Sequence, residues 1–205
     1  MANAVINIAN RLQDILDRTR CVDGLAPLLL RLYLAPVFMQ AGWNKLSHFE
    51  DTAAWFGNPD WGLGLPMPEV MAALAAGTEL FGGALLIVGL AVRWISIPLM
   101  VTMLVAAFAV HWDNGWLAIA DGSSWLANER VMEAQERLAA VKGVLQENAD
   151  YDWLTGRGSV VILNNGIEFS ITYLIMLFSL FFTGAGRLFS IDYWVAKLFR
   201  DQAAS

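Results

Sequence analysis

Four long apolar segments divide the chain, and polar or turn-rich stretches separate them. A helix needs about 20 mostly apolar residues to cross the ~30 Å hydrocarbon layer of a membrane. Such segments cross as helices because lipid cannot satisfy free backbone N–H and C=O groups. The pattern predicts an all-α protein, a bundle of four transmembrane helices at about Leu25–Leu46, Glu69–Val92, Trp94–Val110 and Ser159–Gly186.

The connections between these segments differ in length. The first is rich in glycine and proline, whereas the second is little more than Arg93 and predicts a tight antiparallel hairpin. The third is a long insert at about 112–158. Apolar residues recur there at three- and four-residue intervals from Val131 to Leu145. We therefore expect an amphipathic helix over about 124–148 that lies on the membrane surface or caps the bundle.

Composition supports a membrane protein. Hydrophobic residues make up 57% of the 205 residues and charged residues 16%, whereas a soluble domain has about 25% charged residues. The net charge of −6 disfavours a nucleic-acid partner. Cys21 is the only cysteine, so an internal disulfide or a thiolate cluster is impossible. The sequence has no haem motif, and electron transfer would need a quinone, a metal or a partner protein.

Lysine and arginine near the spans predict the orientation. They gather in the N-terminal segment, at Arg93 and in the C-terminal segment, which includes Arg200. We expect an inner-membrane protein with a cytoplasmic amphipathic segment at 1–24, a membrane domain at 25–192 and a cytoplasmic tail at 193–205. The insert is then extracytoplasmic. Most of the nine tryptophans fall on that side, as an interfacial belt or as a stacking surface for a ring-bearing ligand or a peptide.

Every span contains or adjoins an ionisable residue: Arg31, Glu79, His111 and Glu168, in chain order. A charge at mid-membrane costs roughly 2.5–3.5 kcal/mol on the insertion scale, so each side chain must face the bundle interior and find a partner. Lys45 shares a helical face with Arg31.

Two interpretations of these residues remain open. In the first, Arg31 pairs with Glu79 or Glu168 and only fixes helix packing. In the second, the charged groups converge on a polar pocket that relays protons, holds a quinone head group or coordinates a metal. Glu79, Glu168 and His111 are then the catalytic candidates, and Arg31, Lys45, Asn164 and Asn165 line the pocket or pair with charges.

Depth suggests a specific form of this pocket. With a fourth span that starts at Ser159, Glu168 lies roughly 12–14 Å inside its outer end, at 1.5 Å per residue. Lys45 and His111 lie near the outer ends of their spans. We expect Glu168, His111 and Lys45 to form one outward-facing funnel, with Asn164 and Asn165 on its wall.

A quinone fits this chemistry better than a copper ion. Copper favours imidazole and thioether ligands, but the chain has two histidines, and methionines at helical spacing usually pack in a core. No site residue is therefore assigned to a metal. Nucleotide-binding and common hydrolase motifs are absent from the sequence.

The first span also resembles the opening motif of the DoxX family of four-helix membrane proteins, with Arg31, Ala35, Phe38, Gly42, Lys45 and Leu46. The family usually has glycine at the position of Ala35. Similar elements follow at Glu79–Gly83, Glu168–Phe169 and Gly184–Asp192, so the resemblance extends over about 25–192. Within the family, four segments are similar to the HvfX-like branch: 41–46, 56–64, 111–120 and 151–155.

The resemblance implies a role, which the residues alone do not. The HvfX-like branch implies an inner-membrane protein accessory to maturation or export of a copper-binding modified peptide, in a redox-linked complex with protein partners. The wider family implies a quinone-reducing subunit of an oxidoreductase. A purely structural membrane anchor for soluble partners is the third alternative. Family membership does not by itself establish catalysis.

Overall fold

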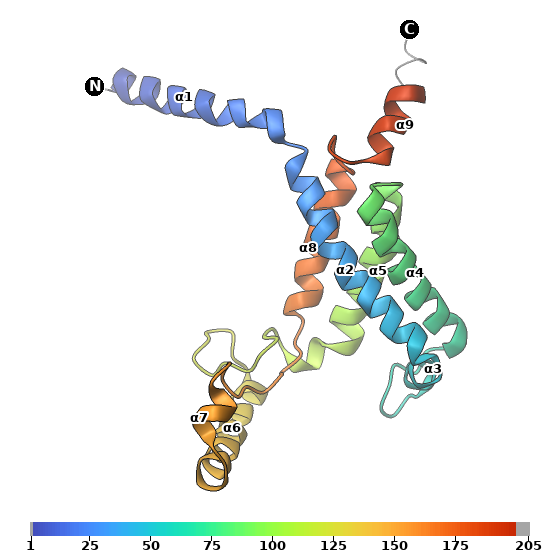
Figure 1. The fold of residues 1–205 in the computed structure, drawn as a ribbon, viewed down its shortest axis with the longest axis vertical. Coiled ribbons are helices and arrows are strands. Elements are labelled where there is room, and N and C mark those ends of the chain that lie inside the picture. Colours follow the sequence, from blue (N-terminus) through green and yellow to red (C-terminus); the bar gives the residue numbers. More distant parts are fainter. Residues whose placement is uncertain (1, 200–205) are drawn as a thin grey trace.

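The computed structural model describes residues 2–199, and these form helices and loops (Figure 1). The helices are α1 (Ala2–Arg18), α2 (Leu25–Ser47), α3 (Phe49–Gly57), α4 (Pro68–Val88), α5 (Val92–Val105), α6 (Glu129–Asn148), α7 (Tyr151–Thr155), α8 (Glu168–Thr183) and α9 (Ile191–Phe199). Within residues 2–199 the only β pairing is one isolated bridge, Ile119 with Leu163. The predicted all-α class is confirmed.

Three helices are long and apolar enough to cross a membrane: Leu25–Ser47, Pro68–Val88 and Val92–Val110. Their bounds lie close to the first three predicted spans. The last of them joins α5 to a π-helical turn, Ala106–Val110. The fourth apolar helix, α8, has only 16 residues and a length of about 24 Å at 1.5 Å per residue. It starts nine residues after Ser159, because residues 159–167 run as a loop against residues 115–120.

The four long apolar helices pack in two close pairs, α2 with α4 and α5 with α8. Small residues allow the first pair to approach closely. A Cβ on Gly42 would lie 2.7 Å from the Ala76 oxygen, and one on Gly83 would lie 2.7 Å from the Ala35 oxygen. These contacts fix an antiparallel register in which Gly42 faces Ala76 and Ala35 faces Gly83. The core between the pairs is apolar and includes Leu34, Phe38, Leu86, Leu99, Leu177 and Leu180.

The two ends of the bundle differ. The terminal end carries the α4–α5 turn, and α1 and α9 extend from it (Figure 1). The insert end carries α3 and the insert. The turn is as tight as predicted: Gly89 and Ala91 both have positive φ, 65° and 53°. Glycine adopts that conformation at little cost, and Asp192 stabilises the turn by accepting hydrogen bonds from the Ala91 and Val92 nitrogens at 2.7 and 2.9 Å.

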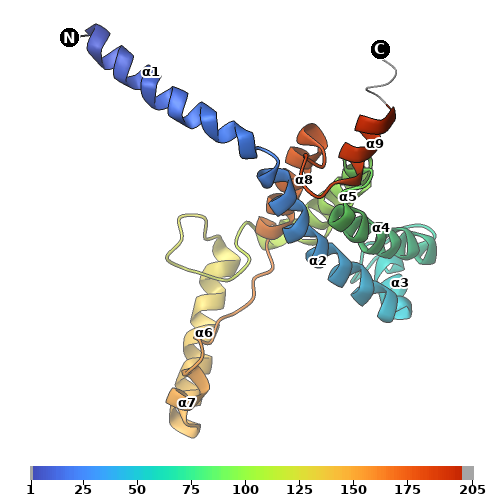
Figure 2. The same ribbon diagram turned by 45° about the horizontal axis from the view of Figure 1, so that its top comes forward.

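The insert contains the predicted helix, but α6 starts at Glu129, where Asn128 caps it through the Val131 nitrogen. Its first half packs on the preceding loop through Val131, Ala134 and Leu138. Its second half exposes Val141 and Val144. Figures 1 and 2 show α6 and α7 extending away from the bundle of α2, α4, α5 and α8, and a location of α6 on the membrane surface stays a prediction.

The terminal segments are helical where they are described. α1 lies within the predicted amphipathic segment 1–24 and exposes apolar side chains, among them Leu12 and Ile15. α9 starts at Ile191, inside the predicted membrane domain. Residues 200–205, which include Arg200 of the orientation argument, lie outside the described residues. The predicted boundaries at 24 and 192 and the cytoplasmic location of both segments stay predictions.

Candidate functional site

A cavity of about 560 Å³ lies at the insert end, between the end of α2, α3, α4 and α5. Its walls are mostly apolar and come from four separate stretches of chain. Three of its lining residues are ionisable: Lys45, Glu79 and His111. An apolar cavity with a few convergent polar groups is the usual form of a small-molecule site.

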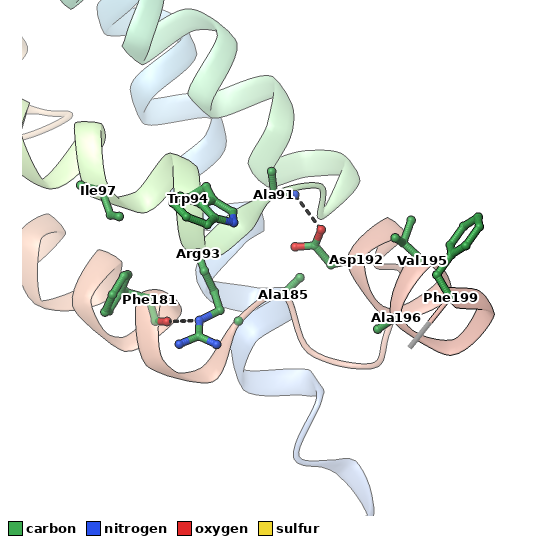
Figure 3. Close-up of a pocket in the computed structure, with 11 residues that line it drawn as sticks. Ala91, Arg93, Trp94, Ile97, Phe181, Ala185, Asp192, Val195, Ala196 and Phe199 are labelled. Atoms are coloured by element: carbon green, nitrogen blue, oxygen red, sulfur yellow. Dashed lines mark hydrogen bonds between the residues drawn. The ribbon is translucent and has the colours of Figure 1, made fainter. Parts of the chain in front are cut away.

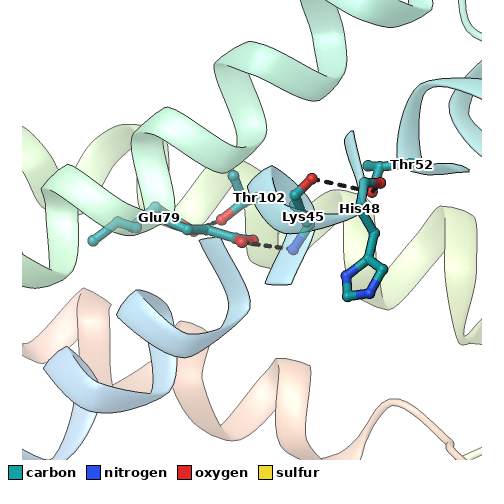
Figure 4. Close-up of polar contacts among 6 residues, drawn as sticks. Lys45, His48, Thr52, Glu79 and Thr102 are labelled. Atoms are coloured by element: carbon teal, nitrogen blue, oxygen red, sulfur yellow. Dashed lines mark hydrogen bonds and ion pairs between the residues drawn. The ribbon is translucent and has the colours of Figure 1, made fainter. Parts of the chain in front are cut away.

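The centre of the polar lining is an ion pair between α2 and α4. The Lys45 Nζ donates to the Glu79 Oε2 at 2.6 Å (Figure 4). The Glu79 side chain is 5% exposed and that of Lys45 29%, so the carboxylate is the deeper partner. Figure 4 places Thr102 of α5 beside this pair. The pair satisfies both charges inside an apolar bundle, where a single charge would be costly.

Arg31 does not take part in this site, and its predicted pairing with Glu79 or Glu168 is wrong. Its side chain is fully buried at the terminal end, where it donates to the Leu86 oxygen at 3.4 Å. It also donates to the Leu188 and Phe189 oxygens at 3.0 and 3.2 Å. The Leu86 carbonyl is at the end of α4, where intrahelical donors are lacking, and the other two belong to the α8–α9 connection; the guanidinium satisfies all three.

His111 lines the cavity and directly follows the π-helical turn. Its Nδ1 is buried and has no hydrogen-bond partner within the described residues 2–199. π-helical turns often occur at functional sites. The wider turn at Ala106–Val110 determines the position at which the helix ends and His111 follows. A buried ring nitrogen without a partner is suited to a hydrogen bond with a ligand in the cavity.

Glu168 lies outside this cavity, so the predicted funnel of Glu168, His111 and Lys45 is wrong in part. Lys45 and His111 do line one cavity, but the carboxylate that accompanies them is Glu79. Glu168 is the first residue of α8, and its Oε2 accepts from the Ala118 nitrogen at 2.9 Å. The depth argument failed because α8 starts at Glu168 and not at Ser159. A carboxylate at a helix N-terminus is favourable there.

Asn164 and Asn165 also do not line the cavity. The Asn164 Nδ2 donates to the Asn114 and Leu117 oxygens at 2.8 and 2.7 Å, and its Oδ1 accepts from the Arg130 Nε at 3.2 Å. Asn165 has a φ of 58°, a left-handed conformation that asparagine tolerates better than most residues. Together they connect the start of α8 to the loop at the beginning of the insert.

The apolar wall formed by α3 was missed in the sequence. Trp55 and Phe56 of α3 and Leu63 and Leu65 of the next loop line the cavity. The many glycines and prolines of this region predict a loop between the first two spans, whereas the structure forms α3 at Phe49–Gly57. Ala53 and Phe56 are both buried in α3 and lie three residues apart. Apolar residues at that spacing are the sequence signal for a short packed helix. Within residues 2–199, no three His, Cys, Asp or Glu side chains cluster as a metal site would require.

Comparison with known proteins covers the same part of the chain. Residues 26–112 match the family described as DoxX. Over 86 residues the chain is 31% identical to the Bacillus subtilis (strain 168) protein named "Putative oxidoreductase CatD". The aligned residues make up 42% of this chain and 60% of that relative. No solved structure matches the chain. The similarity to DoxX proteins therefore covers residues 26–112, which contain Lys45, Glu79 and His111 and exclude the insert and α8.

Proposed function

We propose that this protein is the membrane subunit of a redox-linked complex and that the cavity binds the head group of a quinone. The observation that carries the proposal is the cavity itself, which combines apolar walls with the Lys45–Glu79 ion pair and the unpartnered His111 Nδ1. The similarity to a relative named as an oxidoreductase supports a redox role.

The cavity offers each part of a quinone a suitable surface. The ring carbonyls accept hydrogen bonds, which the Lys45 ammonium and the His111 ring can donate. The isoprenoid tail packs against the apolar wall of α4 and α5, formed in part by Leu74, Val101 and Val105. In this proposal reduction of the quinone to the quinol takes two electrons from a partner protein and two protons through Glu79 and His111.

The first test is direct binding of a short-chain quinone to the purified full-length protein in mild detergent. Val105→Trp fills the cavity, and His111→Ala removes one donor. Each is expected to weaken binding about tenfold, the effect of losing roughly 1.4 kcal/mol of contact. Leu104→Trp is the matched control, because Leu104 is the adjacent residue of α5 and does not line the cavity. It should bind as the unaltered protein does.

Two results would overturn the quinone site. One is equal affinity in Val105→Trp, Leu104→Trp and the unaltered protein, which would place any bound quinone elsewhere. The other is the absence of quinone binding to the unaltered protein, which favours the purely structural anchor. Restored function of a knockout strain by a chain with Lys45, Glu79 and His111 all replaced would support the anchor as well.

Maturation or export of a copper-binding modified peptide is the process in which we place this redox step. Support for that assignment is the resemblance of segments 41–46, 56–64, 111–120 and 151–155 to the HvfX-like branch. The test is co-purification in mild detergent, with mass spectrometry of the proteins that accompany the full chain. Recovery of a peptide-modifying enzyme or of the peptide supports it, and recovery of partners from an unrelated oxidoreductase overturns it.

The proposal includes an orientation in the bacterial inner membrane, with α8 as the fourth span, both termini in the cytoplasm and the insert outside. Support comes from the arginines near the terminal end. In intact cells, Cys21 and a cysteine introduced by Arg93→Cys should be shielded from an impermeant thiol reagent. A cysteine introduced by Ser123→Cys in a chain without Cys21 should react. Labelling of Arg93→Cys from outside would reverse the orientation.

A further inference from the structure

A second cavity, of about 700 Å³, lies at the terminal end of the bundle (Figure 3). It is formed by the start of α5, the end of α8 and the inner side of α9. The hydrogen bonds from Ala91 and Val92 to Asp192, and one from the Asp192 nitrogen to the Gly89 oxygen at 2.9 Å, hold α9 against the α4–α5 turn. This terminal cavity is thus a built feature of the fold and lies at the opposite end from the quinone site.

Arg93 supplies the positive charge of the terminal cavity. Its Nε donates to the Phe181 oxygen at 2.8 Å, and its guanidinium carbon lies 5.7 Å from the centre of the Phe181 ring. These contacts fix the plane of the guanidinium, as Figure 3 shows. Within residues 2–199 its two terminal nitrogens have no hydrogen-bond acceptor, and Arg93 forms no ion pair. The two nitrogens present a flat fork of donors that matches a phosphate group.

The negative charge in the same cavity is already engaged. Both carboxylate oxygens of Asp192 accept from backbone nitrogens at the start of α5. That helix end carries a partial positive charge, which offsets the carboxylate. Asp192 therefore has a structural partner, and Arg93 keeps the capacity to bind an anion.

The remaining walls are apolar and open to the surroundings. Trp94 is 78% exposed and Phe199 72%, and Ile97 and Val195 also line the cavity. Tryptophan is enriched where membrane hydrocarbon meets water, and an arginine beside it lies at the depth of lipid phosphates. A cation at that depth beside an exposed apolar wall complements an amphiphile with an anionic head.

We propose that the terminal cavity binds one anionic glycerophospholipid, with its phosphate on the Arg93 fork and an acyl chain along Trp94 and Ile97. The contact would brace α9 against α5. The proposal is independent of the quinone site, because it involves neither the same residues nor the same end of the bundle.

The test is native mass spectrometry of the delipidated full-length protein, titrated with phosphatidylglycerol and with phosphatidylcholine of identical chains. One phosphatidylglycerol is expected to bind about fivefold tighter than phosphatidylcholine, as one basic residue near a membrane surface contributes about 1 kcal/mol toward anionic lipid. Arg93→Gln should remove this preference. Ala196→Trp fills the cavity while leaving Arg93 in place, and it should weaken binding of both lipids.

Arg157→Gln is the matched control, since it removes the same charge from an exposed loop of the insert. It should keep the fivefold preference. Retention of the preference in Arg93→Gln, or unweakened binding of both lipids to a folded Ala196→Trp variant, would overturn the proposal. Displacement of phosphatidylglycerol by an equal concentration of inorganic phosphate or glycerol phosphate would also overturn it, because the site would then recognise a free phosphate and not a lipid. A folded Ala196→Trp variant keeps the test decisive if Arg93→Gln fails to fold.

Discussion

Replacing Lys45 with methionine is expected to destabilise the protein more than replacing Glu79 with glutamine, although both changes break the same ion pair. Lys45→Met leaves the Glu79 carboxylate, whose side chain is 5% exposed, without a partner in an apolar cavity. A buried charge stripped of its partner costs about 3 kcal/mol or more. Glu79→Gln leaves Lys45, which is 29% exposed, lies near the end of α2 and can extend toward water.

The glutamine side chain in Glu79→Gln also keeps an amide oxygen that accepts a hydrogen bond from the Lys45 ammonium. For Glu79→Gln we therefore expect a loss of about 1 kcal/mol, typical of one weakened hydrogen bond. The measurement is the midpoint of thermal unfolding of each variant in the same detergent, together with the fraction that elutes as folded protein on gel filtration. Equal losses in the two variants would contradict the asymmetry.

The double variant Lys45→Met with Glu79→Leu separates folding from function. Apolar replacement of both members of a buried ion pair is often neutral or stabilising. We expect near-normal thermal stability together with loss of quinone binding. Near-normal binding in the folded double variant would show that the pair serves packing alone.

Much of the fold could be predicted because span length and hydrophobicity are local properties of the sequence. The first three spans and the tight turn at Arg93 depend on nothing else. The fourth span could not be placed in the same way, because Val160–Leu163 is as apolar as a helix and yet runs extended against the insert loop. The β-branched residues at 160–162 and the turn signal of Asn165 and Gly166 favour that outcome in retrospect.

The candidate site was predictable as a set of residues but not as a set of pairs. Pairing depends on the register of α2 against α4, which Gly42 and Gly83 set through close approach to Ala76 and Ala35. In this antiparallel register Arg31 lies level with the end of α4. Lys45 is about 21 Å further along α2, at 1.5 Å per residue, and only it can reach Glu79. The regular repeat of a helix determines which of its residues share a face. The register of the partner helix determines which of those residues it contacts.

Arg31 is expected to be the side chain whose loss harms the fold most. It is fully buried and joins α2 to the Leu86, Leu188 and Phe189 oxygens. Arg31→Met would leave these carbonyls without their donor, at about 1–3 kcal/mol for each buried acceptor that water cannot reach. We expect a sharp fall in folded protein and faster proteolysis of the segment that joins α8 to α9.

Gly89→Ala should produce the same defect although Arg31 itself is not replaced. A Cβ at Gly89 would occupy the position of the Arg31 guanidinium, and the φ of 65° at Gly89 disfavours any side chain. Arg187→Gln is the control at the same end, because it removes only an exposed ion pair with Asp23 and should change stability little. Limited proteolysis and thermal unfolding distinguish the variants. A stable Arg31→Met protein with an intact α8–α9 connection would contradict this prediction, because the hydrogen bonds from Arg31 to the Leu188 and Phe189 oxygens would then be dispensable.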